Sequence, residues 1–253
     1  MTLNISPFCT PAHAVPKTVA DPLLPLNRTK RGVALPNKTW PQHSVLTISL
    51  LNMTTKQKGL VKHNINKWAP YTNLYFKFTD RANGDIRIAA DNNASSGWSK
   101  IGTDAKEVPL HKATMSIGFN CSPTELAAMI QHEFGHGLGL KHEHQHPERT
   151  LDLNKQSIYL EYELQGEFPW QADHNLIQKL PANKVTVSPY DKDSIMHYGF
   201  AASRLNSGDP VPHTEQLSAG DKHFMQTLYP TDNSFFAKLL NTATRAMINT
   251  SVT

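Results

Sequence analysis

The stretch from His132 to His142 constrains this chain more than any other, because it spaces three histidines and one glutamate as metal ligands and a base are spaced. His132 and His136 are four residues apart, so on an α-helix they point the same way and can reach one ion. Glu133 lies about 100° further round that helix, beside the open side of the metal. Gly139 can adopt a positive φ and end the helix, which lets the chain turn back and bring His142 to the ion.

Three neutral imidazole nitrogens and one water form the open tetrahedral site of a catalytic zinc ion, which lowers the pKa of that water to roughly 7. We therefore predict one catalytic Zn²⁺ bound by His132, His136 and His142, with Glu133 as the general base. An isolated His-Glu-x-x-His motif occurs by chance fairly often. With the added glycine and third histidine, chance occurrence in a chain of this length falls to the order of one in ten thousand.

A histidine-rich tract that binds metals without a defined site is the alternative, since five of the 13 histidines lie between His132 and His146. The ordered spacing of the first three favours a defined site. His144 and His146 follow that spacing and do not replace it, so we interpret them as rim residues or as supports for the ligands.

The helix that carries the motif has its own start signal. Ser122 can cap it, Pro123 suits its first position, and Glu125 completes a capping box. An apolar stripe at helical spacing then predicts a buried flank, formed by Leu126, Met129, Ile130, Phe134 and Leu138.

A second motif lies far downstream, at Ser194-Ile195-Met196-His197-Tyr198. Together with the long zinc motif, it resembles the methionine turn of the metzincin metallopeptidases. Within that clan, a Tyr two residues after the Met and a Glu directly after the third His are features of the astacin family, and here they are Tyr198 and Glu143. The chain therefore resembles the astacin-like zinc endopeptidases, and its two cysteines place it closer to microbial than to animal members.

The resemblance implies an α+β fold of the metzincin-type zincins: a twisted, mostly parallel five-stranded sheet with two long helices above the cleft, over an irregular lower subdomain. It implies that Tyr198 binds the zinc in the resting state and then stabilises the oxyanion of the reaction. It also implies that an edge strand near Trp98, Ser99 and Lys100 binds an extended substrate through main-chain hydrogen bonds. Structural roles fall to Gly139, Glu143 and Met196, the last as an apolar floor beneath the histidines.

The resemblance covers residues 32–230 and divides the chain into three parts. Residues 1–31 are proline-rich and aperiodic, so we expect an extended arm or pro-segment. Residues 32–230 form a single catalytic domain, with an upper half to about residue 139 and a lower half from about residue 140. Residues 231–253 form a polar tail with a few apolar residues at helical spacing.

Three features depart from the family. Arg149 is followed by Thr150 where astacins place an Asp. The animal members have two disulfides, whereas this chain has only Cys9 and Cys121. The Phe-x-Gly-Asp motif of the inhibitory pro-segment has no match before Gly32, so any latency must work differently. Cys9 could bind zinc as a thiolate or pair with Cys121, but we expect a simple unpaired thiol.

Hydrophobic periodicity predicts the main elements of the domain. Strands are expected near residues 45–51, 74–78, 85–90, 98–101 and 114–117. Helices are expected at 55–68 and near 156–165, in addition to the zinc helix.

The composition fits one enzyme domain, because 253 residues with 39% hydrophobic content can bury a full core. The net charge of +4 is scattered, so we expect no nucleic-acid partner. No apolar run approaches the roughly 20 residues of a membrane span. We expect a monomer. We expect a secreted or exported protein. Because the amino terminus resembles no signal peptide, either the signal was removed or the protein leaves the cell, as an effector, by another route.

These residues predict a zinc-dependent endopeptidase that hydrolyses proteins or peptides with a metal-activated water. Two alternatives stay open. In a gluzincin-type hydrolase the third ligand is a Glu from a separate helix, so His142 would be dispensable for metal binding. In a catalytically silent, zinc-stabilised binding protein no base is needed, and the presence of Glu133 argues against it.

Overall fold

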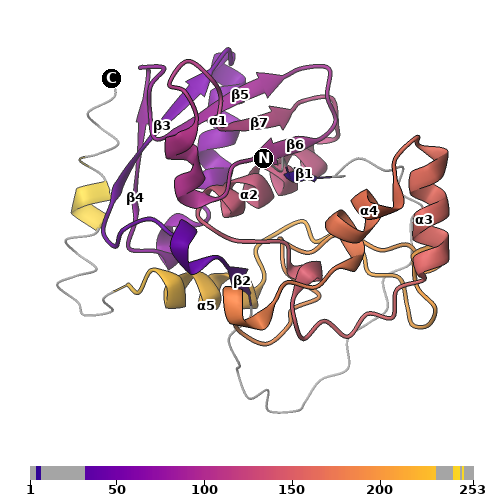
Figure 1. The fold of residues 1–253 in the computed structure, drawn as a ribbon. Coiled ribbons are helices and arrows are strands. Elements are labelled where there is room, and N and C mark those ends of the chain that lie inside the picture. The colour runs from indigo at the N-terminus through magenta and orange to yellow at the C-terminus, as the bar shows by residue number, and fades with distance from the viewer. Residues whose placement is uncertain (1–3, 7–31, 232–241, 246, 248–253) are drawn as a thin grey trace.

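The structure, a computed structural model of the chain, describes residues 4–6, 32–231, 242–245 and 247. Its upper half is built on a mixed sheet of six strands in the order β1-β6-β7-β5-β3-β4 (Figure 1). The strands are β1 Asn4–Ser6, β3 Val45–Leu51, β4 Tyr75–Thr79, β5 Ile86–Asp91, β6 Gly97–Ser99 and β7 Met115–Gly118. β3 is parallel to β4 and β5, and β5 to β7, whereas β6 is antiparallel to both neighbours. The predicted five-stranded, mostly parallel sheet is confirmed, and β1 adds a strand at its edge.

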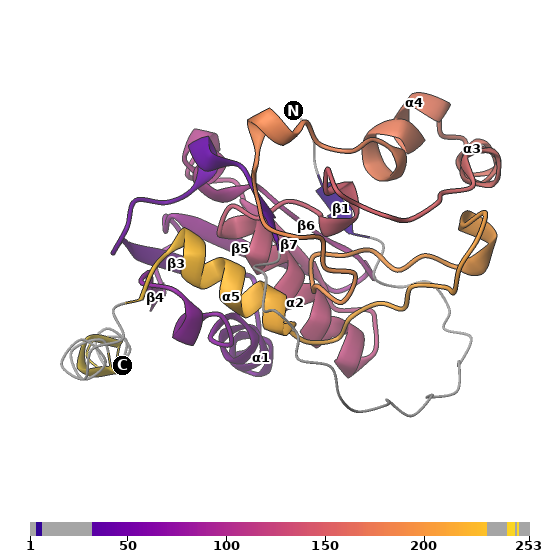
Figure 2. The same cartoon turned by 90° about the horizontal axis from the view of Figure 1, so that it is seen from below.

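Two long helices, α1 Thr55–Ile65 and α2 Pro123–Gly137, cover one face of this sheet (Figure 2). Both begin with a capping box, and the one predicted at Ser122 and Glu125 is confirmed. The buried Trp68 indole donates to the carbonyl of Gln131 at 3.0 Å and joins the segment after α1 to α2.

The first helix ends at Ile65, earlier than the expected end at residue 68. After it, the amides of Lys67 and Trp68 bond to carbonyls three residues back, which tightens the chain into a turn. The 3-10 helix η2 Ala69–Tyr71 follows, and its proline prevents the α-helix from continuing.

The lower half consists of short elements (Figure 1). They are η4 Glu143–Gln145, α3 Lys155–Leu164, α4 Pro169–Ala172, the π-helix η5 Asp173–Ile177, η6 Ala182–Lys184, β8 Thr186–Val187 and η7 Ala202–Arg204. The strand β2 Val33–Ala34 pairs with β8, and the closing helix α5 Ala219–Leu228 returns to the upper half. The helix predicted near 156–165 is confirmed as α3.

The buried apolar residues form two separate clusters, one in each half. Ile195 and Met196 belong to the upper cluster, whereas Tyr198 and Phe200 belong to the lower one. The chain therefore crosses between the two cores within a few residues, and the predicted site lies at this crossing. Cys9 and the residues of the tail with apolar side chains at helical spacing lie outside the described residues. Within the described part of the chain, no helix has the length and apolar character of a bilayer span.

Candidate metal centre

The three histidines of the motif meet at one point. One ligand nitrogen from each of His132, His136 and His142 can be chosen so that all lie within 4.8 Å of one another, and all three side chains are buried. The Nδ1 atoms of His132 and His136 face the carbonyls of Ile195 and Leu140 at 2.7 and 2.9 Å. A nitrogen that faces a carbonyl must carry the hydrogen, so each Nε2 is unprotonated and available to a metal.

The turn after α2 brings the third histidine into place. Gly139 has a φ of +105°, and the amide of Leu140 bonds back to the carbonyl of Gly135 at 3.0 Å. The same turn exposes the Leu140 carbonyl that orients His136. The helix end therefore redirects the chain toward His142 and fixes a second ligand.

This donor set fits zinc. The Nε2 atoms of His136 and His142 lie 3.0 Å apart, close to the roughly 3.3 Å edge of a tetrahedron with zinc–nitrogen bonds of about 2.0–2.1 Å. Burial holds the pKa of both imidazoles well below its usual value, so they are neutral ligands. Among the described residues, one group of three or more histidine, cysteine or acidic side chains is arranged to hold a metal ion, and it consists of these three histidines.

Glu133 lies beside the histidines and is fully buried. Neither of its carboxyl oxygens hydrogen-bonds to a described residue, and burial raises the pKa of the carboxyl well above its usual value. A Cβ placed on Gly97, at the start of β6, would lie 2.9 Å from the Glu133 Cγ. Only a glycine there lets the edge strand approach the carboxylate so closely.

Met196 lies under the helix that carries the ligands. A Cβ on Gly135 would come within 2.5 Å of the Met196 sulfur, so the glycine provides the space for this contact. The carbonyl of Met196 accepts the amide of Glu143 at 2.9 Å, and the Glu143 carboxylate accepts the amide of Asp191 at 2.8 Å. The methionine segment and the third-ligand segment are thus joined in two places.

Asp221, at the start of α5, bonds to the two residues directly before Met196. Its carboxylate accepts the Ser194 hydroxyl at 2.6 Å and the Ile195 amide at 2.8 Å. Burial raises the pKa of this carboxyl to about 6, against the opposing effect of those hydrogen bonds. No sequence pattern indicated this contact, because it joins residues 26 or more apart in the chain.

Tyr198 lies within ring contact of the centre. Its ring centroid is 4.3 Å from that of His142 and 6.0 Å from that of His132. Burial, together with the nearby Glu133, raises the pKa of the phenol well above its usual value. In the arrangement described, the phenol is therefore neutral and can donate a hydrogen bond.

The strand predicted to bind substrate corresponds to β6, which ends just before Lys100 and would be the edge of the sheet without β1. The Ser99 side chain is buried and Trp98 is half-buried. β1 occupies that edge: Ile5 is opposite Trp98, and Ser6 is opposite Gly97.

The two extra histidines are not arranged as ligands. The Nε2 of His144 faces the carbonyl of Asn175 at 2.8 Å, and that of His146 faces the carbonyl of Ser188. Arg149, despite the Thr that follows it, donates to three carbonyls of the lower half, those of His144, Leu176 and Ile177.

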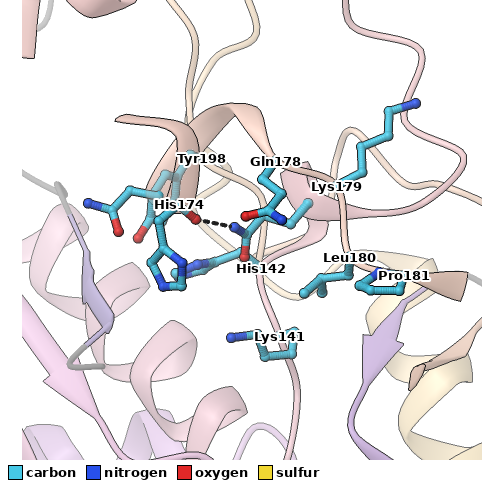
Figure 3. A pocket seen from close by; sticks show the side chains of 10 residues that line it. Lys141, His142, His174, Gln178, Lys179, Leu180, Pro181 and Tyr198 are labelled. Carbon is cyan, nitrogen blue, oxygen red and sulfur yellow. Dashed lines mark hydrogen bonds between the residues drawn. The ribbon is translucent and has the colours of Figure 1, made fainter. Parts of the chain in front are cut away.

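A pocket of about 180 Å³ opens beside the centre (Figure 3). His142 and Tyr198 lie on one side of it, and Leu180 and Pro181 on the other. The π-helix η5 contributes His174 and Asn175 to its wall. The sequence did not predict this wall, because a single irregular turn leaves no periodic signal.

The buried histidines predict an acid-sensitive fold. Burial lowers the pKa of His132 and His197 to about 4, from a usual value of 6.5. The unfolded chain therefore binds protons at a higher pH than the folded chain does. These histidines leave the free energy of unfolding unchanged above about pH 6.5 and lower it progressively as the pH falls toward about 4. Asp221, between its usual 3.8 and about 6, and Glu133, whose pKa burial also raises, act in the opposite direction, but they are two groups against several histidines.

We expect the free energy of unfolding of the zinc-free protein to fall by more than about 2 kcal/mol between pH 7 and pH 5. Urea denaturation at the two pH values measures it. Equal midpoints and slopes at pH 7 and pH 5 would contradict the prediction.

Comparisons with known proteins agree with this geometry. The model of the family Astacin (Peptidase family M12A) matches residues 32–235. The solved structure of myroilysin is 32% identical with a TM-score of 0.75, and the match covers 79% of this chain and 100% of that one. High choriolytic enzyme 1, a hatching enzyme zinc-protease from Oryzias latipes, is 21% identical with a TM-score of 0.52, over 76% of this chain and 94% of that one, and so supports the fold alone.

Two curated relatives match at lower identity than myroilysin. Bone morphogenetic protein 1 of Xenopus laevis is 25% identical over 77% of this chain and 27% of its own length. Astacin-like metalloprotease toxin 2 of Loxosceles intermedia is 28% identical over 75% of this chain and 66% of its own length. The chain thus spans about a quarter of the first of these relatives and about two thirds of the second. With four fifths of its length matched by the family model, the chain belongs to the astacin family of peptidases.

Proposed function

We propose that this protein is a zinc-dependent endopeptidase acting on protein or peptide substrates. The observation that carries the proposal is the buried cluster of His132, His136 and His142 with the uncompensated carboxyl of Glu133 beside it. Zinc bound there supplies a Lewis acid and a water of lowered pKa. A purely structural zinc site would have four protein ligands and no need for a buried base.

Residues of the chain bind the substrate, transfer the proton and stabilise the oxyanion. The main chain of β6 binds the substrate as an added strand and holds its scissile bond next to Glu133. A divalent cation held by the histidines would favour the ionised form of the buried Glu133 carboxyl. Glu133 then accepts the proton of the attacking water on a carboxyl oxygen and passes it to the leaving amine. The Tyr198 hydroxyl donates a hydrogen bond to the oxyanion, a role that its raised pKa favours.

Digestion of casein or gelatin by the purified protein tests the proposal. We expect cleavage that a chelator abolishes and that stoichiometric zinc restores, because the bond-breaking water depends on the ion. Activity that resists complete removal of the metal would refute the assignment. An absence of cleavage in the zinc-loaded protein, with residues 1–31 removed, would favour the silent binding protein.

We also propose that residues 1–31 are a pro-segment. β1 pairs with β6 from Asn4 opposite Ser99 to Ser6 opposite Gly97, which is the edge that a substrate would need. Substrate binding then requires this strand to leave, and the apparent affinity falls by the fraction of open molecules.

A chain that begins at Gly32 is therefore expected to cleave peptides with a kcat/KM more than about 10-fold above that of the full chain, if the edge is covered in over about nine tenths of molecules. A matched peptide assay of the two proteins measures it. Equal kcat/KM values would show that the arm does not block the site.

Export and a monomeric state complete the proposal. One relative is named as a toxin and one neighbour as a hatching enzyme, names that support a protease acting outside the cell. Immunoblots of cells and medium test the location, and light scattering tests the monomer.

A further inference from the structure

His144 belongs to a close group of three rings behind the metal ligands. Its centroid lies 4.3 Å from that of Tyr198 with the planes 28° apart, and 5.1 Å from that of His142 with the planes 25° apart. The centroids of His142 and Tyr198 are themselves 4.3 Å apart. The three ring centroids therefore form a triangle with sides of 4.3, 4.3 and 5.1 Å, in which His144 is stacked on both other rings.

The position of His144 is fixed by its own contacts. It is fully buried, and its Nε2–H donates to the carbonyl of Asn175 at 2.8 Å. The rings of His197 and Phe200 meet it edge-on at 6.1 and 5.8 Å. The hydrogen bond and these two edge contacts hold the His144 ring in one orientation, so it offers a flat face.

Neither metal binding nor hydrogen bonding to the substrate explains this residue. Its Nε2 is used by Asn175, and its Nδ1 is buried without a hydrogen-bond partner among the described residues. What His144 presents to the site is the face of its ring, and Tyr198 lies against that face.

We infer that His144 is a positioning residue for Tyr198: its ring sets the plane in which the phenol reaches the reacting carbonyl. The inference rests on the proposed peptidase function. Tyr198 comes from a segment more than 50 residues beyond His144 and belongs to the lower core, whereas two of the ligands are on α2. His144 contacts both Tyr198 and the ligand His142 and so joins the phenol to the metal centre. This contact matters because a misplacement of about 1 Å in a catalytic group can cost about 100-fold in rate.

Two substitutions of similar bulk separate the ring from simple space filling. His144→Leu fills the site without a flat face, and His144→Phe retains the flat face; both lose the hydrogen bond to Asn175. We expect His144→Leu to lower kcat by about 10- to 100-fold with KM within about twofold, and His144→Phe to stay within about threefold of the parent. His63→Ala, at an exposed position on α1, is the control. Rates are expressed per bound zinc, because His144 also contacts His142.

A double-mutant cycle identifies the partner. In a Tyr198→Phe background, which has already lost the hydroxyl, His144→Leu should change kcat by less than about twofold. If the effects multiply, or if Leu and Phe at position 144 behave alike, His144 does not act through Tyr198 and the inference is overturned.

A spectroscopic measurement avoids activity altogether. In the zinc-free protein labelled with ¹³C-tyrosine, the Tyr198 ring signal is the one that Tyr198→Phe removes. We expect His144→Leu to shift it, because the stacked ring current is lost, and His63→Ala to leave it unchanged. An unshifted signal overturns the inference even if the protein is an active peptidase. Conversely, an inactive parent protein with a shifted signal would refute the proposed function and leave the ring contact supported.

Discussion

Replacing Glu133 by alanine is expected to lower kcat/KM for peptide hydrolysis by about 1,000-fold or more while the protein keeps its zinc. The carboxyl is the proposed proton carrier for both water and leaving amine, and each proton transfer by a positioned group contributes about 100- to 10,000-fold. Its oxygens make no hydrogen bond to the described residues, so its loss leaves the histidine contacts with Ile195 and Leu140 intact. Single-turnover and steady-state assays, with metal analysis of the same sample, measure the two effects.

Glu133→Gln should lose as much activity, because it keeps the size of the side chain and removes only the proton chemistry. Glu163→Ala, at an exposed position on α3, should behave as the parent protein. If Glu133→Ala hydrolysed a peptide at the parent rate with zinc bound, this carboxyl would not be the base.

Replacing His142 by alanine is expected to remove the metal itself. Loss of even a supporting contact to a ligand costs about 10- to 100-fold in metal affinity, so loss of one of three ligands should exceed about 100-fold. After dialysis, metal analysis should show a zinc content well below one per chain, and activity should fall to that of the chelated parent.

His63→Ala is the matched control for this experiment, since its side chain is exposed on the outer face of α1. Stoichiometric zinc in His142→Ala would show that another residue completes the site, as in the gluzincin alternative. A protein that loses zinc but keeps a full rate would contradict the metal-dependent mechanism itself.

The parts of the structure that were predictable from sequence are those encoded by local contacts. The Ser122 capping box and the spacing of His132 and His136 depend only on helix geometry, and the structure has both. β4 alternates buried Phe76 and Phe78 with half-buried neighbours, the pattern that identified it as a strand. Family resemblance then supplied Met196 and Tyr198, which no local pattern would have joined to the histidines.

What sequence did not reveal depends on contacts between distant segments. Asp221 reaches the methionine turn from another helix, and the stack of His144 on Tyr198 forms only after the lower half has folded. The early end of α1 has a different cause, a local balance of two turn types that hydrophobic spacing does not resolve. For Asp221 and His144 the residue type was ordinary, and its neighbour in space made it distinctive.

The brevity of β6 bears on how the molecule behaves in concentrated solution. An open sheet edge displays N–H and C=O groups that another chain can join, and long flat edges promote aggregation. In the proposed peptidase, β6 becomes such an edge once β1 has left it, and it must then be open to substrate. Since β6 spans only Gly97–Ser99, a second copy docking there would gain few hydrogen bonds, whereas a substrate peptide would also reach the metal centre beside Gly97. An edge of this length can align the proposed substrate and is too short to nucleate an intermolecular sheet.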